Sequence, residues 1–453
     1  MENLLVNKVA AVKEVRQAAE YQKKKQACIL TGLAGSSKPV FFAATDKLLG
    51  GKGSMAFITA SREEIRTYRR ELNYLYPDLP MQELYPVSLP RVQADTQSLE
   101  LQAGRAAALR FLSGEERGIV FITAEALQQK QLRPSGMSGK ALQLAVGEEH
   151  EQRNIAAALL DLGYERTEQV DALGQFCLRG DILDVYPINS SAAVRIEWFD
   201  NELDAMRSFD VDTQRSLQTL DSIKIAPLKV DESFSYDADI FEYCAADTMV
   251  VVDEPVHVFG MLEKLDKENK EHASELFGKQ ELIEQLAANG AVLVSALGHS
   301  YLQQLPSLNI PVRAVAPYNK NTNLLVEDLQ NWLAEGITPL IMLSGSIKAR
   351  GFADNLRNYG LKGHFAQKSF EPGVVNVTYG DLDHGFRFWD EEWLLLTEND
   401  IFGMQKRKRL HTKNQGQQLQ YFSDIKAGDY VVHKVHGIGR YIGVENVEVD
   451  GIH

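Results

Sequence analysis

Short apolar runs recur along the amino-terminal part of the chain, with amphipathic helical stretches between them. The first three are ACILTGL, SMAFITAS and GIVFITAEAL, and the helical stretch REEIRTYRRELNYLY lies between the second and the third. A helical pattern over residues 8–21 precedes the first run. A helix between two buried strands allows the strands to lie parallel in one sheet. The pattern therefore predicts an α/β fold built on a parallel sheet.

This pattern changes near Gly147 and returns after Pro227. A predicted helix, RNIAAALLDLGY, leads into three strand-like runs, QFCLRGDILDVYP, AAVRIEWFD and ELDAMRSFD. Asp200 and Asn201 favour a hairpin turn between the last two runs. The α/β pattern then resumes with the buried run TMVVVDEPVHV. We therefore predict an antiparallel α+β module inserted into a parallel α/β parent.

A second α/β unit is predicted after about residue 305, from the helix NLLVEDLQNWLAEG, the strand TPLIMLSG and the helix IKARGFADNLRNYG. A polar, basic connector follows, and the chain closes with GDYVVHKVHGIGRYIGVENVEVDGIH, in which strand material alternates with glycine turns. This ending favours a small β-barrel. Two or three strands are too few to be stable alone, so we expect the chain to stop inside that domain.

The overall composition limits the classes of function. The 453 residues include 62 acidic and 48 basic side chains, and the net charge of −14 argues against a surface devoted to nonspecific phosphate binding. Cys28, Cys177 and Cys244 are widely spaced without C-x-x-C patterning, so we expect neither disulfides nor a metal site. No apolar run approaches the roughly 20 residues of a membrane span. We therefore expect a cytoplasmic protein without a membrane partner.

The stretch TGLAGSSKPVFFAA resembles a phosphate-binding loop of the form G-x-x-x-x-G-K-[ST] that has lost two positions. Ser37 replaces the second glycine, and Pro39 replaces the hydroxyl residue that would bind Mg²⁺. Asp253 and Glu254, after a buried strand, match the acidic pair of such a site. We predict a degenerate site with no catalytic residue. It comprises Gly32, Gly35, Ser37, Lys38, Pro39, Asp253 and Glu254.

The segments FCLRGDILDVYP and VRIEWFDNELDAMRSFDVDTQRS resemble UvrB and the bacterial transcription-repair coupling factors. The chain is similar to the coupling factors over essentially its whole length, and LTENDIFG and the closing β segment match later parts of that family. The resemblance implies an amino-terminal half like UvrB, with a degenerate ATP site. The family's translocase motor is absent from this chain.

On this resemblance the chain divides into six parts. The predicted parts are a UvrB-like domain 1a with the degenerate P-loop (1–145), an inserted UvrA-binding module like UvrB domain 2 (146–228), a UvrB-like domain 1b (229–308), a small α/β domain of unclear role (309–403), a basic linker (404–423) and the start of a CarD-like RNA polymerase-interacting domain (424–453).

In this family the inserted module binds UvrA through arginines and their neighbours on a sheet face. The implied UvrA-binding residues are Arg166, Phe176, Arg179, Asp181, Arg195 and Glu197. Cys177 stands where UvrB commonly has another arginine. Strand alternation puts Cys177 and Arg179 on one side and Phe176 on the other. The competing interpretation is solvation of an isolated surface arginine, and a cross-strand ion pair for Arg195 and Glu197.

The resemblance implies an adaptor that recruits UvrA to RNA polymerase stalled at DNA lesions, with no ATP hydrolysis and no cofactor in this fragment. ATP and Mg²⁺ would serve the motor of the full-length protein, a DNA translocase that would also make most of the DNA contacts. The beta subunit of RNA polymerase would bind the terminal domain, and the carboxy-terminal region would mask the UvrA surface.

Two alternatives stay open. Lys38 and the acidic pair favour an active UvrB-like ATPase or helicase of excision repair. The terminal β segment favours a protein that is chiefly a polymerase-binding module, whose main interaction would be lost on deletion of everything after Gln420.

Overall fold

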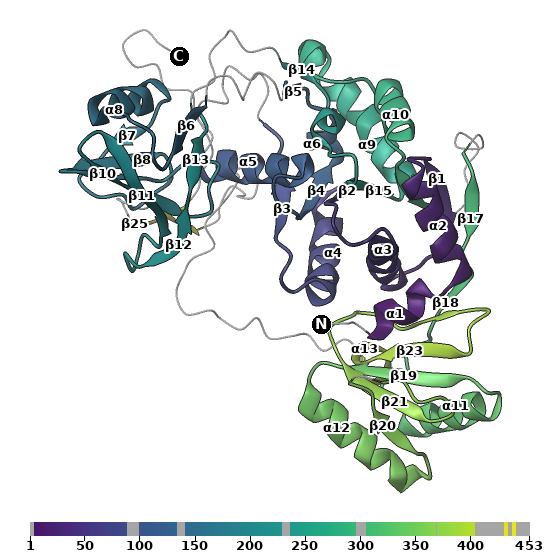
Figure 1. The fold of residues 1–453 in the computed structure, drawn as a ribbon. Coiled ribbons are helices and arrows are strands. Elements are labelled where there is room, and N and C mark those ends of the chain that lie inside the picture. The colour runs from purple at the N-terminus through teal and green to yellow at the C-terminus, as the bar shows by residue number, and fades with distance from the viewer. Residues whose placement is uncertain are drawn as a thin grey trace. The chain divides into compact units, whose positions relative to one another are not determined.

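The computed structural model describes residues 4–87, 99–133, 141–228, 236–295, 305–367, 369–403, 430–433 and 437–440 (Figure 1). The chain divides into two compact units, Met1–Met404 and Gln405–His453. In the second unit β24 (Tyr430–His433) pairs antiparallel with β25 (Gly437–Arg440). The rest of the β-barrel predicted over residues 424–453, and the linker predicted over 404–423, lie outside the described residues.

A seven-stranded sheet with the strand order β17-β1-β16-β15-β2-β4-β3 organises the first unit. Its strands are β1 (Cys28–Thr31), β2 (Met55–Thr59), β3 (Met81–Leu84), β4 (Ile119–Thr123), β15 (Met249–Asp253), β16 (Val292–Ser295) and β17 (Ser307–Asn309). Every neighbouring pair in it is parallel. The predicted α/β fold with a parallel sheet is confirmed.

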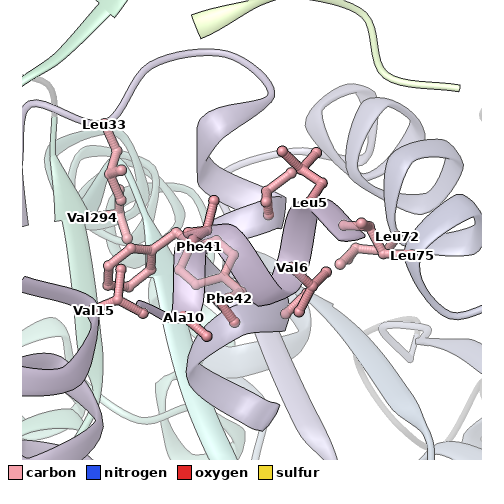
Figure 2. Close-up of a cluster of buried hydrophobic side chains, with 14 of the residues drawn as sticks. Leu5, Val6, Ala10, Val15, Leu33, Phe41, Phe42, Leu72, Leu75 and Val294 are labelled. Carbon is pink, nitrogen blue, oxygen red and sulfur yellow. The ribbon is translucent and has the colours of Figure 1, made fainter. Parts of the chain in front are cut away.

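Helices cover both faces of this sheet (Figure 1). One face carries α1 (Leu4–Ala10), α2 (Lys13–Lys23), α3 (Ser37–Leu48) and α4 (Arg62–Leu75); the other carries α5 (Leu99–Ser113), α6 (Ala124–Gln128), α9 (Pro255–Glu268) and α10 (Lys279–Ala288). Because successive strand residues point to opposite faces, Phe57 packs in the first hydrophobic cluster and Ile58 in the second. Figure 2 shows part of the first cluster, to which α1 contributes Leu5 and Val6 and α4 contributes Leu72 and Leu75.

Two predicted elements differ from the structure. The single helix predicted over residues 8–21 is wrong, because the chain breaks into α1 and α2 at Val12, whose backbone is extended (φ −62°, ψ 135°). The break allows Val9 and Val12 both to be buried. The third predicted strand ends at Thr123, whose hydroxyl accepts a hydrogen bond of 3.3 Å from the Ala126 amide and caps α6.

Between β4 and β15 the chain forms a separate six-stranded sheet with the order β12-β11-β10-β9-β8-β7. Its elements are the helix α8 (Gln152–Asp161) and the strands β7 (Glu165–Arg166), β8 (Gln175–Arg179), β9 (Ile182–Val185), β10 (Ala193–Phe199), β11 (Glu202–Phe209) and β12 (Ser216–Leu220). Only β7 and β8 pair parallel within this sheet. The predicted antiparallel module is therefore confirmed.

The turns and ends of this module follow from local sequence. The run QFCLRGDILDVYP forms two strands rather than one, because Gly180 adopts φ +58° and reverses the chain. The predicted hairpin is confirmed, with Asp200 at φ +59°. The module is connected to its parent through β6 (Leu142–Ala145) and β13 (Ser222–Ile225), which pair antiparallel.

A second α/β sheet has the order β18-β22-β23-β19-β21-β20. Its elements are β18 (Val312–Ala314), α11 (Thr322–Ala334), β19 (Thr338–Leu343), α12 (Ser346–Asn355), β20 (Gly363–Phe365), β21 (Val375–Tyr379), β22 (Phe386–Phe388), β23 (Trp393–Thr397) and α13 (Glu398–Phe402). The edge strand β18 continues directly from β17 of the first sheet (Figure 1). The chain thus passes from the edge of one sheet to the edge of the other.

The remaining elements are short. The strands β5 (Gln131–Leu132) and β14 (Tyr236–Ala238) pair antiparallel, and 3-10 helices lie at Ile240–Tyr243, Lys270–Glu275 and Leu356–Tyr359. Within the described part of the chain, no helix combines the length and the apolar character that crossing a membrane requires.

Candidate functional site

One face of the module's sheet carries charged side chains, while the opposite face packs against α8. Asp184, Arg195 and Arg207 lie in register across β9, β10 and β11. Arg179 on β8 and Glu197 on β10 lie opposite the same position of β9, one from each side, so both belong to this face. We call Arg179, Asp184, Arg195, Glu197 and Arg207 the arginine face.

Asp184 is the centre of the arginine face, and only 2% of its side chain is exposed. Its Oδ1 accepts a hydrogen bond from Arg195 Nε at 2.6 Å and its Oδ2 accepts one from Arg195 Nη2 at 2.8 Å. This bidentate contact with the carboxylate raises the pKa of Arg195. Arg179 Nη2 donates to the same Oδ2 at 3.1 Å, yet 54% of the Arg179 side chain is exposed. Asp184 thus orients an arginine whose guanidinium still reaches solvent.

The rest of the arginine face is also paired. Arg207 Nη2 donates to Glu197 Oε1 at 2.5 Å, and the Arg195 guanidinium lies 4.7 Å over the ring of Phe209. Arg195 and Glu197 both make cross-strand ion pairs, as the competing interpretation predicted, but with Asp184 and Arg207 rather than with each other. Three arginines and two carboxylates leave a net charge of +1 on this face of a chain with −14 overall.

The other predicted UvrA-binding residues lie away from the arginine face. Phe176 is fully buried in the cluster under α8, because strand alternation turns it into the core, so its side chain is not on the exposed surface of the module. Arg166 is exposed on the edge strand β7, in register with Phe176 and not with Arg179. Asp181 is exposed in the β8–β9 turn, where Gln152 Nε2 donates to it at 3.4 Å.

Sequence reasoning missed three residues at this site: Asp184, Arg207 and Phe199. Phe199 ends β10 with 75% of its surface exposed, although aromatic side chains of this size are usually buried. Alternation along AVRIEWF places it on the side of Arg195 and Glu197, which is a signal that the sequence already contained. The carboxylates that pair with the arginines are set by how the strands pair, so no local sequence pattern indicates them.

The loop between β1 and α3 has the backbone of a tight strand-to-helix turn. Gly32 and Gly35 adopt φ +88° and +53°, and a Cβ at Gly32 would approach the Ile310 carbonyl oxygen to 2.3 Å. Lys38 Nζ lies 2.7 Å from Asp253 Oδ1 and 2.9 Å from Glu254 Oε1. Burial alone would lower the pKa of Lys38, but its contacts with the two carboxylates outweigh burial and raise it. The structure therefore brings the predicted lysine and acidic pair together.

The polar groups of this loop are occupied within the chain. The hydroxyl of Ser37 accepts a hydrogen bond from the Ala34 amide at 3.0 Å and donates to the Ala34 carbonyl at 2.8 Å. The amides of Ser37 and Lys38 donate to the carbonyls of Ala34 and Gly35, both at 3.2 Å. Pro39, inside the first turn of α3, has no amide hydrogen to donate. The amides of Ala34, Ser37 and Lys38, which could otherwise bind a phosphate, thus already donate hydrogen bonds within the loop.

A turn of the second α/β sheet, residues 381–385, packs on the same loop. The His384 amide donates to Ser36 Oγ at 2.9 Å, and the Asp383 amide donates to Glu71 Oε1 at 2.9 Å. Ser36 and Glu71 are both buried and hydrogen-bonded to each other. A Cβ at Gly35 would lie only 3.5 Å from His384 Cβ. The loop therefore serves as a contact between the two α/β sheets.

The described residues give little support for a metal site or for a reactive cysteine. No group of three or more His, Cys, Asp or Glu residues suited to a metal ion occurs within the described ranges. The three cysteines are free thiols, and burial raises the pKa of Cys28 and of Cys244 to about 12. Protonated, buried thiols of this kind are poor nucleophiles and ligands.

The fold and the arginine face define a multidomain, mixed α/β protein with an antiparallel module suited to binding a partner. The family model "UvrB interaction domain" matches residues 142–230, which cover this module, and the model "CarD-like/TRCF RID domain" matches residues 425–453.

Curated proteins named transcription-repair-coupling factor are similar to 94% of the chain. The protein of Bacillus subtilis (strain 168) is 25% identical, that of Staphylococcus haemolyticus 24% and that of Staphylococcus aureus (strain MRSA252) 23%. The resemblance to the transcription-repair coupling factors predicted from the sequence is thereby confirmed. The chain spans 42–43% of the length of these relatives.

Replacing Asp184 by asparagine should destabilise the chain by about 2 to 3 kcal/mol, because the substitution leaves the Arg195 guanidinium partly buried without its bidentate partner. Urea unfolding measures this free energy. Glu197→Gln is the matched control, since Glu197 is half-exposed and its ion pair should be worth about 0–1 kcal/mol. Equal losses in the two variants would contradict the central role of Asp184.

Proposed function

We propose that this chain is the amino-terminal part of a transcription-repair coupling factor and acts as an adaptor that recruits UvrA to RNA polymerase stalled at DNA lesions. The observation that carries the proposal is the match of residues 142–230 to the UvrB interaction domain, over a module with a charged sheet face. The similarity to coupling factors over 94% of the chain supports it. The six domain boundaries given above are part of this proposal.

UvrA would dock on the arginine face, with Arg179 as the principal contact. The exposed Arg179 guanidinium can bind a carboxylate of the partner in a bidentate manner. Its contact with Asp184 limits its rotamers before binding, which lowers the entropy lost in the complex. Phe199 would add apolar contact area at the end of β10. An arginine beside an exposed aromatic ring is a common composition of interface hot spots.

The second proposed partner is RNA polymerase, through its beta subunit. The support is the match of residues 425–453 to the CarD-like/TRCF RID domain. Because the chain spans less than half of its relatives, three further statements about the whole protein belong to the proposal. A motor outside this chain would use ATP and Mg²⁺, that motor would make most DNA contacts, and the carboxy-terminal region would mask the UvrA surface.

We further propose that this fragment does not hydrolyse ATP. The loop amides bond to the loop's own carbonyl and hydroxyl groups, and Lys38 is neutralised by Asp253 and Glu254. The 381–385 turn packs against Gly35 through His384, whose amide donates to Ser36 Oγ, and so covers part of a loop that would otherwise receive phosphates. The rival function, a UvrB-like ATPase, is favoured by the meeting of Lys38 with the acidic pair, so it needs a direct test.

Calorimetric titration with purified UvrA tests the adaptor function. The unmodified chain should bind, and Arg179→Glu should weaken binding about tenfold or more, because the substitution places a carboxylate where the partner offers another. Arg153→Glu makes the same charge change on α8, away from the arginine face, and should leave the affinity unchanged. Absence of binding, or equal weakening by both variants, would contradict the proposal.

Phosphate release from ATP tests the second claim. The unmodified chain should show no turnover above the level of the buffer, and Lys38→Ala should give the same trace. Turnover that disappears in Lys38→Ala would establish the UvrB-like ATPase and overturn the interpretation of Pro39.

A further inference from the structure

Two arginines face each other at the edge of the second α/β sheet. Arg313 on β18 is the direct antiparallel partner of Arg387 on β22. Side chains at such positions stand about 4.5–5.5 Å apart at Cβ, where like charges destabilise a sheet. Nothing in the strand pairing requires arginine at either position, so the pair invites an explanation outside the fold.

Neither guanidinium is compensated within the described residues, where no hydrogen bond or ion pair involves the side chain of Arg313 or Arg387. Arg387 is half-buried, and its Nε is fully buried without an acceptor. Buried polar groups almost always have a partner, so an unpaired arginine donor marks a missing acceptor. The acceptor that suits two neighbouring guanidinium groups is an anionic oxygen.

An exposed tryptophan completes the surface. Trp389 lies directly after the end of β22, two residues beyond Arg387, and is 50% exposed. The Arg313 guanidinium stacks 3.9 Å from the centre of its ring. This contact orients Arg313 without neutralising it. We call Arg313, Arg387 and Trp389 the edge cluster.

We propose that the edge cluster binds an acidic segment of a protein partner, with a side-chain carboxylate between Arg313 and Arg387 and an apolar side chain against Trp389. The sheet order leaves β18 at an edge, where an extended segment can lie alongside it. Trp and Arg are the residues most enriched at protein interface hot spots. This surface lies on a different sheet from the arginine face and does not depend on UvrA binding.

The neighbouring charges favour a peptide over a nucleic acid. Asp390, Glu391 and Glu392 follow Trp389 directly in the sequence. A row of phosphates passing over the edge cluster would meet these carboxylates, whereas one or two glutamates of a peptide can reach the arginines alone. The expected ligand is therefore a short acidic peptide segment.

Fluorine NMR of the chain labelled with 5-fluorotryptophan tests this proposal, with a short peptide that carries one leucine and two glutamates between glycines, the diglutamate peptide, as the probe. Trp389→Phe assigns the relevant resonance. At low ionic strength, where screening is weak, the Trp389 signal should shift and saturate as the peptide is added. Arg313→Gln should weaken this binding by about tenfold, the loss expected for one charged hot-spot contact. Because Arg313 is exposed, its replacement leaves the core intact.

Two controls make the outcome decisive. Arg357→Gln removes an exposed arginine that already pairs with Asp354, and it should leave the peptide titration unchanged. A thymidylate trinucleotide with two phosphodiester groups should shift the Trp389 signal less than the diglutamate peptide of equal charge. The proposal is overturned by a Trp389 signal that does not respond to the diglutamate peptide, by an equal response in Arg313→Gln, or by a stronger response to the trinucleotide.

Discussion

The parallel pairing of β2 with β15 is the constraint on which the first unit depends. It joins Met55 to Met249 and so unites two halves of a sheet that the intervening module separates in sequence. This pairing completes the parent sheet without any strand of the module. The module has its own hydrophobic core and is connected to the parent sheet through the antiparallel strands β6 and β13. The arginine face thus lies on a sheet that is separate from the parent sheet.

Burial separates the residues that hold the arginine face in place from those that are exposed on it. Asp184 is buried and accepts hydrogen bonds from two arginines, so it positions them; Arg179 and Phe199 are exposed, so they are available for contact. The same division explains the loop at Ser36, where the hydroxyl and amide groups bond within the chain. The strand-to-helix turn and the contact with the second sheet both depend on the shape of this loop.

Much of this architecture could be predicted from the sequence. Apolar runs separated by helical stretches predicted the parallel sheet, and the change of pattern at Gly147 predicted the antiparallel module. Strand alternation also separated Cys177 and Arg179 from Phe176 correctly, although the family resemblance had counted Phe176 among the contacts.

What could not be predicted depends on contacts between distant segments. The bond from the His384 amide to Ser36 joins residues 348 positions apart, and no local pattern indicates it. The pairing of Arg195 with Asp184 likewise required the register of β9 on β10. The break at Val12 reflects burial against α3, which overrides a continuous helical periodicity.

Hydroxyl-radical footprinting of the chain, alone and with UvrA, tests the central claim most directly. Because Phe199 is exposed, it should react in the free chain, and it should lose this reactivity in the complex because it lies beside the arginine face. Tyr359 is exposed at the end of the 3-10 helix Leu356–Tyr359, in the second α/β unit, and it should stay equally reactive in both samples. A complex in which Phe199 remains fully reactive would place UvrA elsewhere and contradict the account.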